Sequence, residues 1–260
     1  MRLLPFPKYG QTEVWIAKFD PDVARVLELT LNSTERAHWR KLHFEKHQLR
    51  YIFAHGVLRT ILSGYVGVSP NTIHFSANSF GKPYIDMPEA DPRISFNMSH
   101  ADDLTIVAVT LAQAVGVDVE SVRPIPELDN IAQDYFSDTE QALLQSSPAG
   151  LKEQVFCRCW TRKEAYVKAV GKGLSIPLNS FDTSMHPTAK GRSLNSTEHA
   201  PQIESWWLSD LTLPYGYVGA LVVEGVEPKI NYLNWNQIYG TIASPGGTDG
   251  AKGLSPICRL

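Results

Sequence analysis

Two stretches of the chain decide its fold and its chemistry: Gly-Val-Asp-Val-Glu-Ser at residues 116–121, and Trp-Thr-Arg-Lys-Glu-Ala-Tyr-Val-Lys-Ala-Val-Gly-Lys-Gly-Leu at residues 160–174. The first alternates in polarity, as a strand does. Asp118 and Glu120 then leave the same face with Cα atoms roughly 6.6 Å apart, while the valines face a core. A bare pair of this kind is more typical of an edge strand exposed to water, although two close carboxylates also favour a cation beside them.

The second stretch predicts a helix that ends at Gly171. Glu164 and Lys168 are four residues apart, so they share one helix face. Alone they predict a surface ion pair that contributes about 0.3 to 0.5 kcal/mol. The glycines that follow end the helix within one turn of Lys168 and let a ligand approach. Taken together, the strand and the helix predict three carboxylates and a lysine around one Mg²⁺.

Outward from these stretches, the pattern of elements predicts an α+β protein in which one order of elements occurs twice. In the first unit we expect strands at 12–19, 94–98 and 104–111, a short helix at 21–31 and a long helix, in one piece or two, at 32–66. Residues 99–103 connect the last two strands. From Val115 the order restarts. Strands are expected at 115–121, 203–208 and 217–223, and helices at 125–135, from 137 onward and at 152–170. We therefore expect subdomains at 1–114 and 115–239, followed by a Gly/Ser/Pro-rich flexible tail at 240–260.

Composition excludes several classes of protein. A net charge of −3 and a pI near 6.2 argue against a broad basic surface for nucleic acid or membrane. Three cysteines make no even disulfide framework. No apolar run approaches the roughly 18 residues of a membrane span. The apolar stretch at the N-terminus is too short, and too interrupted by proline, to form the core of a signal peptide. We expect a cytoplasmic protein.

Four motifs in order resemble one known family. Gly-Lys-Pro-Tyr at 81–84 and Phe-Asn-Met-Ser-His at 96–100 precede the two stretches quoted above. This set looks like the signature of the 4′-phosphopantetheinyl transferases. The restart at Val115 is similar to the monomeric, surfactin-type branch of that family, in which two α+β halves related by pseudo-twofold symmetry are fused. The resemblance covers about residues 40 to 225.

The resemblance implies transfer of the 4′-phosphopantetheine arm of coenzyme A to a serine of an apo acyl or peptidyl carrier protein, with release of adenosine 3′,5′-bisphosphate. Asp118, Glu120 and Glu164 would hold Mg²⁺, or Mn²⁺ in its place, against the pyrophosphate. Such a hard cation accepts carboxylates and phosphate oxygens and neutralises charge as the phosphoryl bond breaks. Glu164 is the first candidate for the base, directly or through a water molecule, and Lys168 would assist the leaving group or proton transfer.

The resemblance also assigns residues to coenzyme A. Ser99 and His100 match positions that contact its 3′-phosphate, Lys82 matches a basic contact to the nucleotide end, and Arg50 matches a further basic position. Lys168 would lie beside the pyrophosphate. Near the family's N-terminal binding loop, this chain has Arg36 and His38 where a lysine pair is expected.

Two alternatives remain open at this stage. A non-catalytic module that binds coenzyme A or a carrier would need fewer of the acids than the chain has. A metal-dependent phosphodiesterase also suits D-x-E with a nearby Glu and Lys, but the low basic content opposes a DNA substrate. For the carrier, residues 121–136 are a candidate contact surface, the alternative being that their apolar side chains only cover the core.

Overall fold

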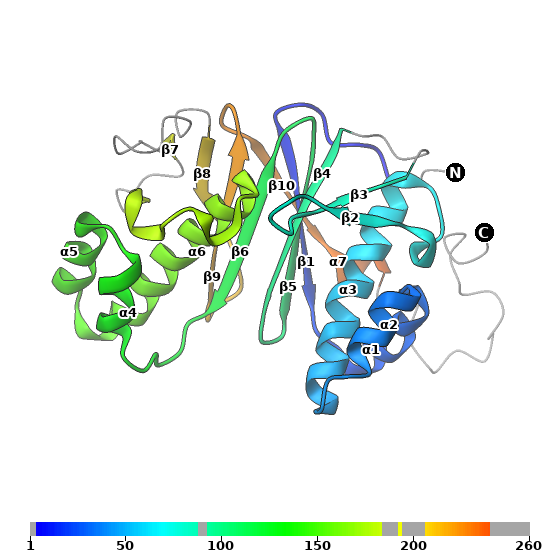
Figure 1. Cartoon of the computed structure of the whole chain (residues 1–260), viewed down its shortest axis with the longest axis horizontal. Helices are drawn as coiled ribbons and strands as arrows, with labels where there is room; N and C mark the ends of the chain where they lie inside the picture. The colour runs from blue at the N-terminus through cyan, green and yellow to red at the C-terminus, as the bar shows by residue number, and fades with distance from the viewer. Residues whose placement is uncertain (1–3, 88–92, 184–191, 194–205, 240–260) are drawn as a thin grey trace.

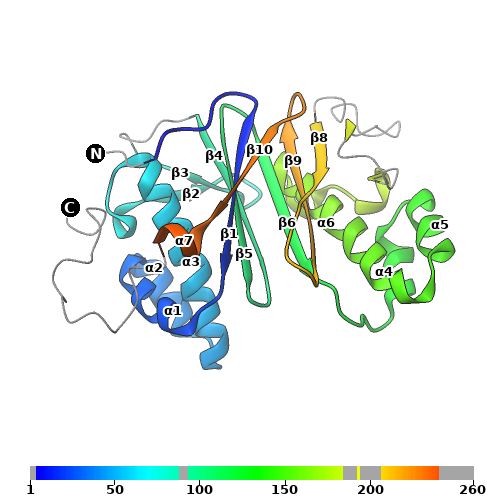
Figure 2. The same cartoon turned by 180° about the vertical axis from the view of Figure 1, so that it is seen from behind.

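Two β-sheets stand side by side at the centre of the protein, and helices cover the outer face of each (Figure 1, and from behind in Figure 2). The computed structural model describes residues 4–87, 93–183, 192–193 and 206–239. The tail predicted at 240–260 lies outside these residues. Within the described ranges, no helix combines the length and apolar character needed to cross a membrane.

The first sheet has the strand order β10-β1-β5-β4 and belongs mainly to the N-terminal half. A β2–β3 hairpin lies beside it. The elements of this half are β1 (Gln11–Lys18), α1 (Pro21–Leu27), the 3₁₀ turn η1 (Glu28–Thr30), α2 (Ser33–Trp39), α3 (Glu45–Val66), η2 (Pro70–Thr72), β2 (Phe75–Ala77), β3 (Pro83–Ile85), β4 (Ile94–Ala101) and β5 (Leu104–Leu111).

The second sheet has the order β6-β9-β8-β7, and all of its neighbouring strands are antiparallel. Its elements, with the two that close the chain, are β6 (Val115–Ser121), α4 (Leu128–Tyr135), α5 (Asp138–Ser146), η3 (Ala149–Leu151), α6 (Lys152–Val170), η4 (Gly173–Ser175), η5 (Leu178–Ser180), β7 (Arg192–Ser193), β8 (Trp206–Asp210), β9 (Tyr217–Glu224), β10 (Lys229–Asn234) and α7 (Trp235–Tyr239).

Among the described residues, four apolar cores hold these layers together. Helix α3 packs on the first sheet and α6 on the second. Between the sheets, Val117 and Val119 of β6 pack with Ile106 and Ala108 of β5 in a core of buried side chains. The alternation of β6 therefore does what the sequence predicted, because its valines enter this core and its acids face α6. At β4, Asn97 Oδ1 accepts a hydrogen bond of 2.9 Å from Val117 N and fixes the two edge strands against each other.

Most element boundaries follow from local chemistry. Strand β6 and helix α6 have the predicted limits, and α5 begins at a capping box in which Ser137 and Glu140 satisfy each other's backbone N–H groups. Helix α6 ends because Gly171 takes a left-handed conformation, φ 72°. The helical segment predicted at 32–66, in one piece or two, is formed by the two helices α2 and α3.

Two features differ from the sequence-based expectation. Strand β4 continues to Ala101, so Ser99 and His100 lie on a strand and only residues 102–103 form the connection. The last strand, β10, pairs in parallel with β1 in the first sheet, and Trp235 and Tyr239 of α7 join the core of the N-terminal half. The chain thus returns to its first half after completing the second, while the division at 114/115 stays a prediction.

Candidate active site

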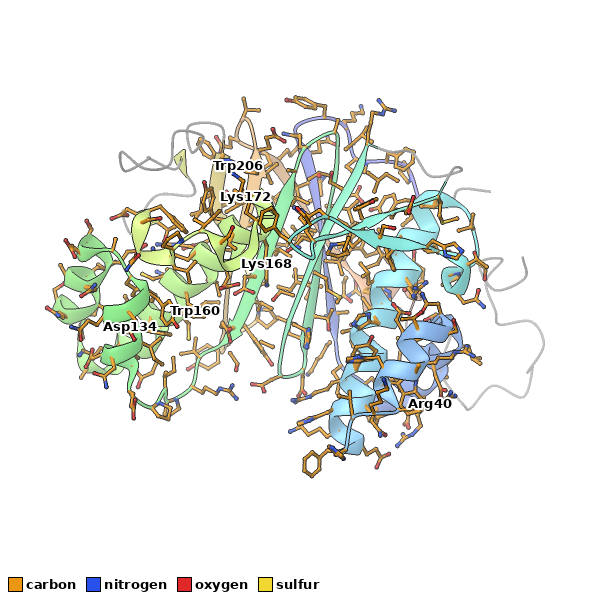
Figure 3. All side chains as sticks on the ribbon, in the orientation of Figure 1. Arg40, Asp134, Trp160, Lys168, Lys172 and Trp206 are labelled. Atoms are coloured by element: carbon orange, nitrogen blue, oxygen red, sulfur yellow. The ribbon has the colours of Figure 1, made fainter. Side chains whose placement is uncertain are left out.

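Asp118, Lys168 and Ser99 meet where β6, α6 and β4 converge. Lys168 Nζ lies 2.5 Å from Asp118 Oδ1 and 3.3 Å from Ser99 Oγ, and Ser99 donates a hydrogen bond of 2.8 Å to the same carboxylate oxygen. Asp118 is only 4% exposed. Figure 3 shows Lys168 near the middle of the molecule, on the side of α6 that faces the other half. The acid of β6 is therefore a buried partner of the helix, not an acid exposed to water.

Gly116 explains how β6 and α6 come so close. A Cβ atom at this position would lie 2.0 Å from the carbonyl oxygen of Ala165 and 2.3 Å from the backbone nitrogen of Ala169. Both neighbours are helix backbone, so they cannot turn away as a flexible side chain would. Glycine thus lets the strand backbone rest directly on the helix, and this close approach brings Asp118 within reach of Lys168.

Glu120 and Glu164 complete the acidic face of the site. Burial, followed by repulsion from Asp118, raises the pKa of Glu120 to about 7. The same two causes raise the pKa of Glu164, and Lys168 opposes them in both cases. The carboxylates therefore repel one another, and a cation placed among them would stabilise their charged forms.

The donor set fits a hard divalent cation. Asp118 Oδ2 is buried and has no hydrogen-bond partner, so one carboxylate oxygen has coordination capacity to spare. Oxygen ligands from carboxylates are those that Mg²⁺ and Mn²⁺ accept. Among the described residues, however, no three Asp, Glu, His or Cys side chains are already gathered into a ready-made metal site. The Lys168 ammonium group instead contacts the other oxygen of this carboxylate, Asp118 Oδ1.

A cavity of about 390 Å³ opens beside this cluster and is rich in cationic and imidazole side chains. It is lined by Leu42, His47, Arg50, Tyr51, His55, His100, Ala101, Asp102, Glu120, Ser121 and Arg123. The predicted residues Arg50 and His100 are thus brought together at its wall with the predicted metal ligand Glu120. A negatively charged ligand of the size of a nucleotide phosphate suits this lining.

The turn between β4 and β5 holds the two arginines of the cavity. Arg50 donates to Asp103 Oδ1 at 2.8 Å, and both Arg50 and Arg123 lie 3.8 Å from Asp102 Oδ1. His100 keeps an exposed surface. Partial burial in the cavity, followed by repulsion from His55 and Lys168, lowers its pKa.

Lys82 lies away from this cavity. Its Nζ donates to the carbonyl oxygens of Val115, at 3.0 Å, and Ala169, at 2.8 Å, so it ties the β2–β3 hairpin to the other half of the chain. Burial lowers its pKa to about 8. A second cavity of about 280 Å³ lies beside Lys82 and is also lined by Glu164 and Lys168.

An apolar cavity of about 230 Å³ adjoins the cationic one, since both are lined by Glu120, Ser121 and Arg123. Its other walls are Ile125, Ile131, Phe156, Cys157 and Trp160. Of the apolar residues expected to contact a carrier, Ile125 and Ile131 line this cavity, whereas Phe136 is 1% exposed and belongs to the core.

Sequence reasoning missed His47, Tyr51 and His55 as a set. They lie four residues apart along α3, so they share one face of the helix that lines the cationic cavity. The ring of Tyr51 stacks on that of His55 with centroids 4.0 Å apart. The i, i+4, i+8 spacing was the signal that could have identified them.

Comparison with known proteins identifies the family of the chain. Residues 19–112 match the family described as 4′-phosphopantetheinyl transferase, N-terminal, and residues 114–222 match the 4′-phosphopantetheinyl transferase superfamily. The 4′-phosphopantetheinyl transferase HetI of Nostoc sp. (strain PCC 7120) is 33% identical over 223 residues, which are 84% of this chain and 91% of HetI.

A second curated relative points the same way. The 4′-phosphopantetheinyl transferase Sfp of Bacillus subtilis (strain 168) is 30% identical over 172 residues, 66% of this chain and 74% of Sfp. The solved holo-[acyl-carrier-protein] synthase of Thermotoga maritima shares 21% identity over 43% of this chain and 62% of its own, at a TM-score of 0.35. On the strength of the family matches and HetI, the chain belongs to the 4′-phosphopantetheinyl transferases, enzymes that transfer phosphopantetheine to carrier proteins.

Proposed function

We propose that the enzyme transfers the 4′-phosphopantetheine arm of coenzyme A to a serine of an apo carrier protein in a reaction that requires Mg²⁺ or Mn²⁺. The observation that carries this proposal is the contact of Lys168 with Asp118 at the junction of the two halves, with Glu120 and Glu164 beside it. A lysine and three carboxylates in a half-buried site suit a pyrophosphate and its counter-ion better than they suit any neutral ligand.

The nucleotide end of coenzyme A is assigned to the cationic cavity. Arg50 and Arg123 supply fixed positive charge there, and His100 can donate a hydrogen bond to a phosphate oxygen in either protonation state. Ser99 already donates to Asp118, so its role toward the 3′-phosphate requires its hydroxyl to turn. Lys82 contributes to the nucleotide end only if its ammonium group leaves the carbonyls of Val115 and Ala169.

Asp118, Glu120 and Glu164 are the proposed metal ligands. When bound, the cation supplies charge neutralisation for the pyrophosphate as the phosphoryl bond breaks. The residues themselves must then reorganise in one respect, because Lys168 is the present partner of Asp118. Its Nζ would pass from the carboxylate to a pyrophosphate oxygen and stabilise the leaving group there.

In the reaction, the carrier's serine oxygen attacks the β-phosphorus of coenzyme A. The bond from that phosphorus to the bridging oxygen breaks, and the electron pair leaves with adenosine 3′,5′-bisphosphate. The serine proton needs an acceptor as the new P–O bond forms. Glu164 is the proposed acceptor, directly or through a water molecule.

We further propose that the enzyme belongs to the surfactin-type branch of the family, with the halves divided at 114/115. Support comes from the two sheets in one chain, each with its own covering helices. With this division the proposed site would lie between the halves, since Ser99 and His100 come from β4 and the acids from β6 and α6.

The test is an assay of the purified chain with coenzyme A, an apo carrier protein and Mg²⁺, followed by the mass of the carrier and by the release of adenosine 3′,5′-bisphosphate. We expect the product to require all three components and to disappear with a chelator. Binding of coenzyme A without transfer would instead indicate the non-catalytic module. Hydrolysis of phosphodiesters without modification of the carrier would indicate the phosphodiesterase.

A panel of fatty-acid, polyketide and peptide-synthetase carriers in the same assay identifies the substrate class. Glu164→Gln tests the base separately. Near-normal turnover of this variant, with its metal dependence intact, would remove Glu164 from that role.

A further inference from the structure

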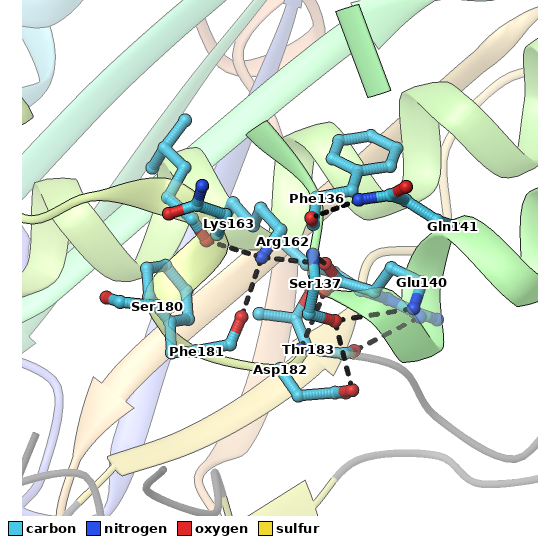
Figure 4. Close-up of polar contacts among 12 residues, drawn as sticks. Phe136, Ser137, Glu140, Gln141, Arg162, Lys163, Ser180, Phe181, Asp182 and Thr183 are labelled. Atoms are coloured by element: carbon cyan, nitrogen blue, oxygen red, sulfur yellow. Dashed lines mark hydrogen bonds and ion pairs between the residues drawn. The ribbon is translucent and has the colours of Figure 1, made fainter. Parts of the chain in front are cut away.

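Lys163, the residue before Glu164, is completely buried and uses every proton of its ammonium group. Its side chain has 0% exposure, and Nζ donates to the carbonyl oxygens of Leu178 and Phe181 and lies near Glu140 Oε2, each at 2.7 Å. Figure 4 shows these contacts converging on Nζ. A lysine is almost never fully buried unless it is paired, so burial of Lys163 depends on these three partners.

Glu140 is satisfied as fully as its partner. One carboxylate oxygen accepts hydrogen bonds from Thr183 N, at 2.8 Å, and Thr183 Oγ1, at 2.6 Å. The other accepts from Ser137 N at 2.9 Å, which is the capping bond that starts α5. The Lys163–Glu140 pair with its backbone partners, called the buried clamp below, therefore joins the middle of α6, the start of α5 and the segment 178–183.

Such a pair is a poor means of gaining stability. Removing two charges from water costs free energy that their attraction only partly returns, and apolar side chains of similar volume often do as well. What a fully satisfied buried network provides instead is a single arrangement of the groups that it joins. The buried clamp thus fixes how α6 is rotated and where it lies along its axis.

That rotation decides where Glu164 points. Consecutive residues on a helix are about 100° apart, so α6 sends Lys163 into the clamp and Glu164 toward Asp118. Arg162, one position earlier, is fixed on another side by Asp210 of β8, with Nε and Nη2 at 2.8 and 2.7 Å from the carboxylate. Helix α6 is thereby held at Arg162 and Lys163, the two positions just before Glu164.

We infer that Lys163, through its buried clamp with Glu140, is a positioning residue that orients Glu164 and Lys168 of α6 toward Asp118 for binding of the divalent cation. The inference rests on the proposed function, because it assigns Glu164 to the cation. Lys163 itself touches neither substrate nor metal.

The test compares Lys163→Met, and the double variant Lys163→Met/Glu140→Leu, with the wild-type enzyme. The double variant removes both charges, so it leaves no unpaired carboxylate if the single variant fails to fold. Mn²⁺ binding to the free protein is measured by electron paramagnetic resonance, and carrier modification is measured against Mg²⁺ concentration. The matched control is Leu144→Ala, which opens a cavity on α5 near Glu140 but keeps the clamp.

In a folded clamp variant, we expect the dissociation constant of Mn²⁺ to rise at least tenfold and the Mg²⁺ concentration for half-maximal activity to rise with it. Leu144→Ala should lower the melting temperature while its Mn²⁺ affinity stays within twofold of the wild type. Unchanged Mn²⁺ affinity in a folded clamp variant overturns the inference. So does failure of both clamp variants to fold, which would make the clamp a requirement of the fold alone. Absence of Mn²⁺ binding by the wild-type enzyme would count against the proposed function instead.

Discussion

Substitution of Gly116 by alanine should damage both the fold and the reaction. The added Cβ would lie 2.0 Å from Ala165 O, whereas ordinary contact begins at 3.4 Å, so β6 and α6 must separate by roughly 1.4 Å (3.4 Å less 2.0 Å). Overpacking of a close-packed interior typically costs about 1 to 3 kcal/mol, and two backbone neighbours place this site at the upper end. The same displacement pulls Asp118 from Lys168, and a misplacement of about 1 Å can lower turnover roughly 100-fold.

The assay is urea unfolding of Gly116→Ala beside kcat for carrier modification at saturating coenzyme A and Mg²⁺. Gly150→Ala is the matched control, because a Cβ there meets nothing within 4 Å; it should leave both quantities unchanged. The reasoning would be refuted by a Gly116→Ala enzyme that unfolds within 1 kcal/mol of the wild type and turns over normally.

Three further predictions concern single side chains. Lys168→Met should retain the fold and lose roughly 100- to 1,000-fold in kcat, because the pyrophosphate loses its cation at the leaving group; a loss confined to KM would contradict this role. His100→Ala should raise KM for coenzyme A roughly 10- to 100-fold, the value of one charge-assisted hydrogen bond, and should change KM for dephospho-coenzyme A far less; equal changes would place His100 away from the 3′-phosphate. Because burial lowers the pKa of Lys82 from 10.5 to about 8, the unfolded chain binds more protons between these values, so the unfolding free energy should rise with pH across this window. This rise should be absent in Lys82→Met, and parallel pH profiles for the two proteins would show that the Lys82 ammonium group is not buried in solution.

The parts of the fold that local chemistry controls could be predicted from the sequence. Strand β6 and helix α6 have the predicted limits because alternation, helical spacing and a terminal glycine act within a few residues. The same holds for α5, because its N-cap Ser137 and Glu140 form a capping box from residues three apart in the sequence. Alternation also placed Val117 and Val119 in a core, and spacing placed Glu164 and Lys168 on one face.

The parts that depend on distant contacts could not be predicted in this way. Strand β10 pairs with β1, which lies more than 200 residues earlier in the sequence, and no local pattern predicts that pairing. Lys82 illustrates the same limit within the site, since its sequence context gives no sign that the carbonyls of Val115 and Ala169 bind it. Lys163 is a stronger case, because a lysine inside a polar stretch predicts exposure and only tertiary packing buries it.

The most direct test of the central claim is the mass of an apo carrier protein incubated with the enzyme and coenzyme A at increasing Mg²⁺ concentration. We predict that the carrier gains one phosphopantetheine group, only when coenzyme A and Mg²⁺ are both present, and that Asp118→Asn abolishes the gain. An unchanged carrier mass at every Mg²⁺ concentration would contradict the account, provided that the enzyme is folded and that a transferase of established activity loads the same carrier.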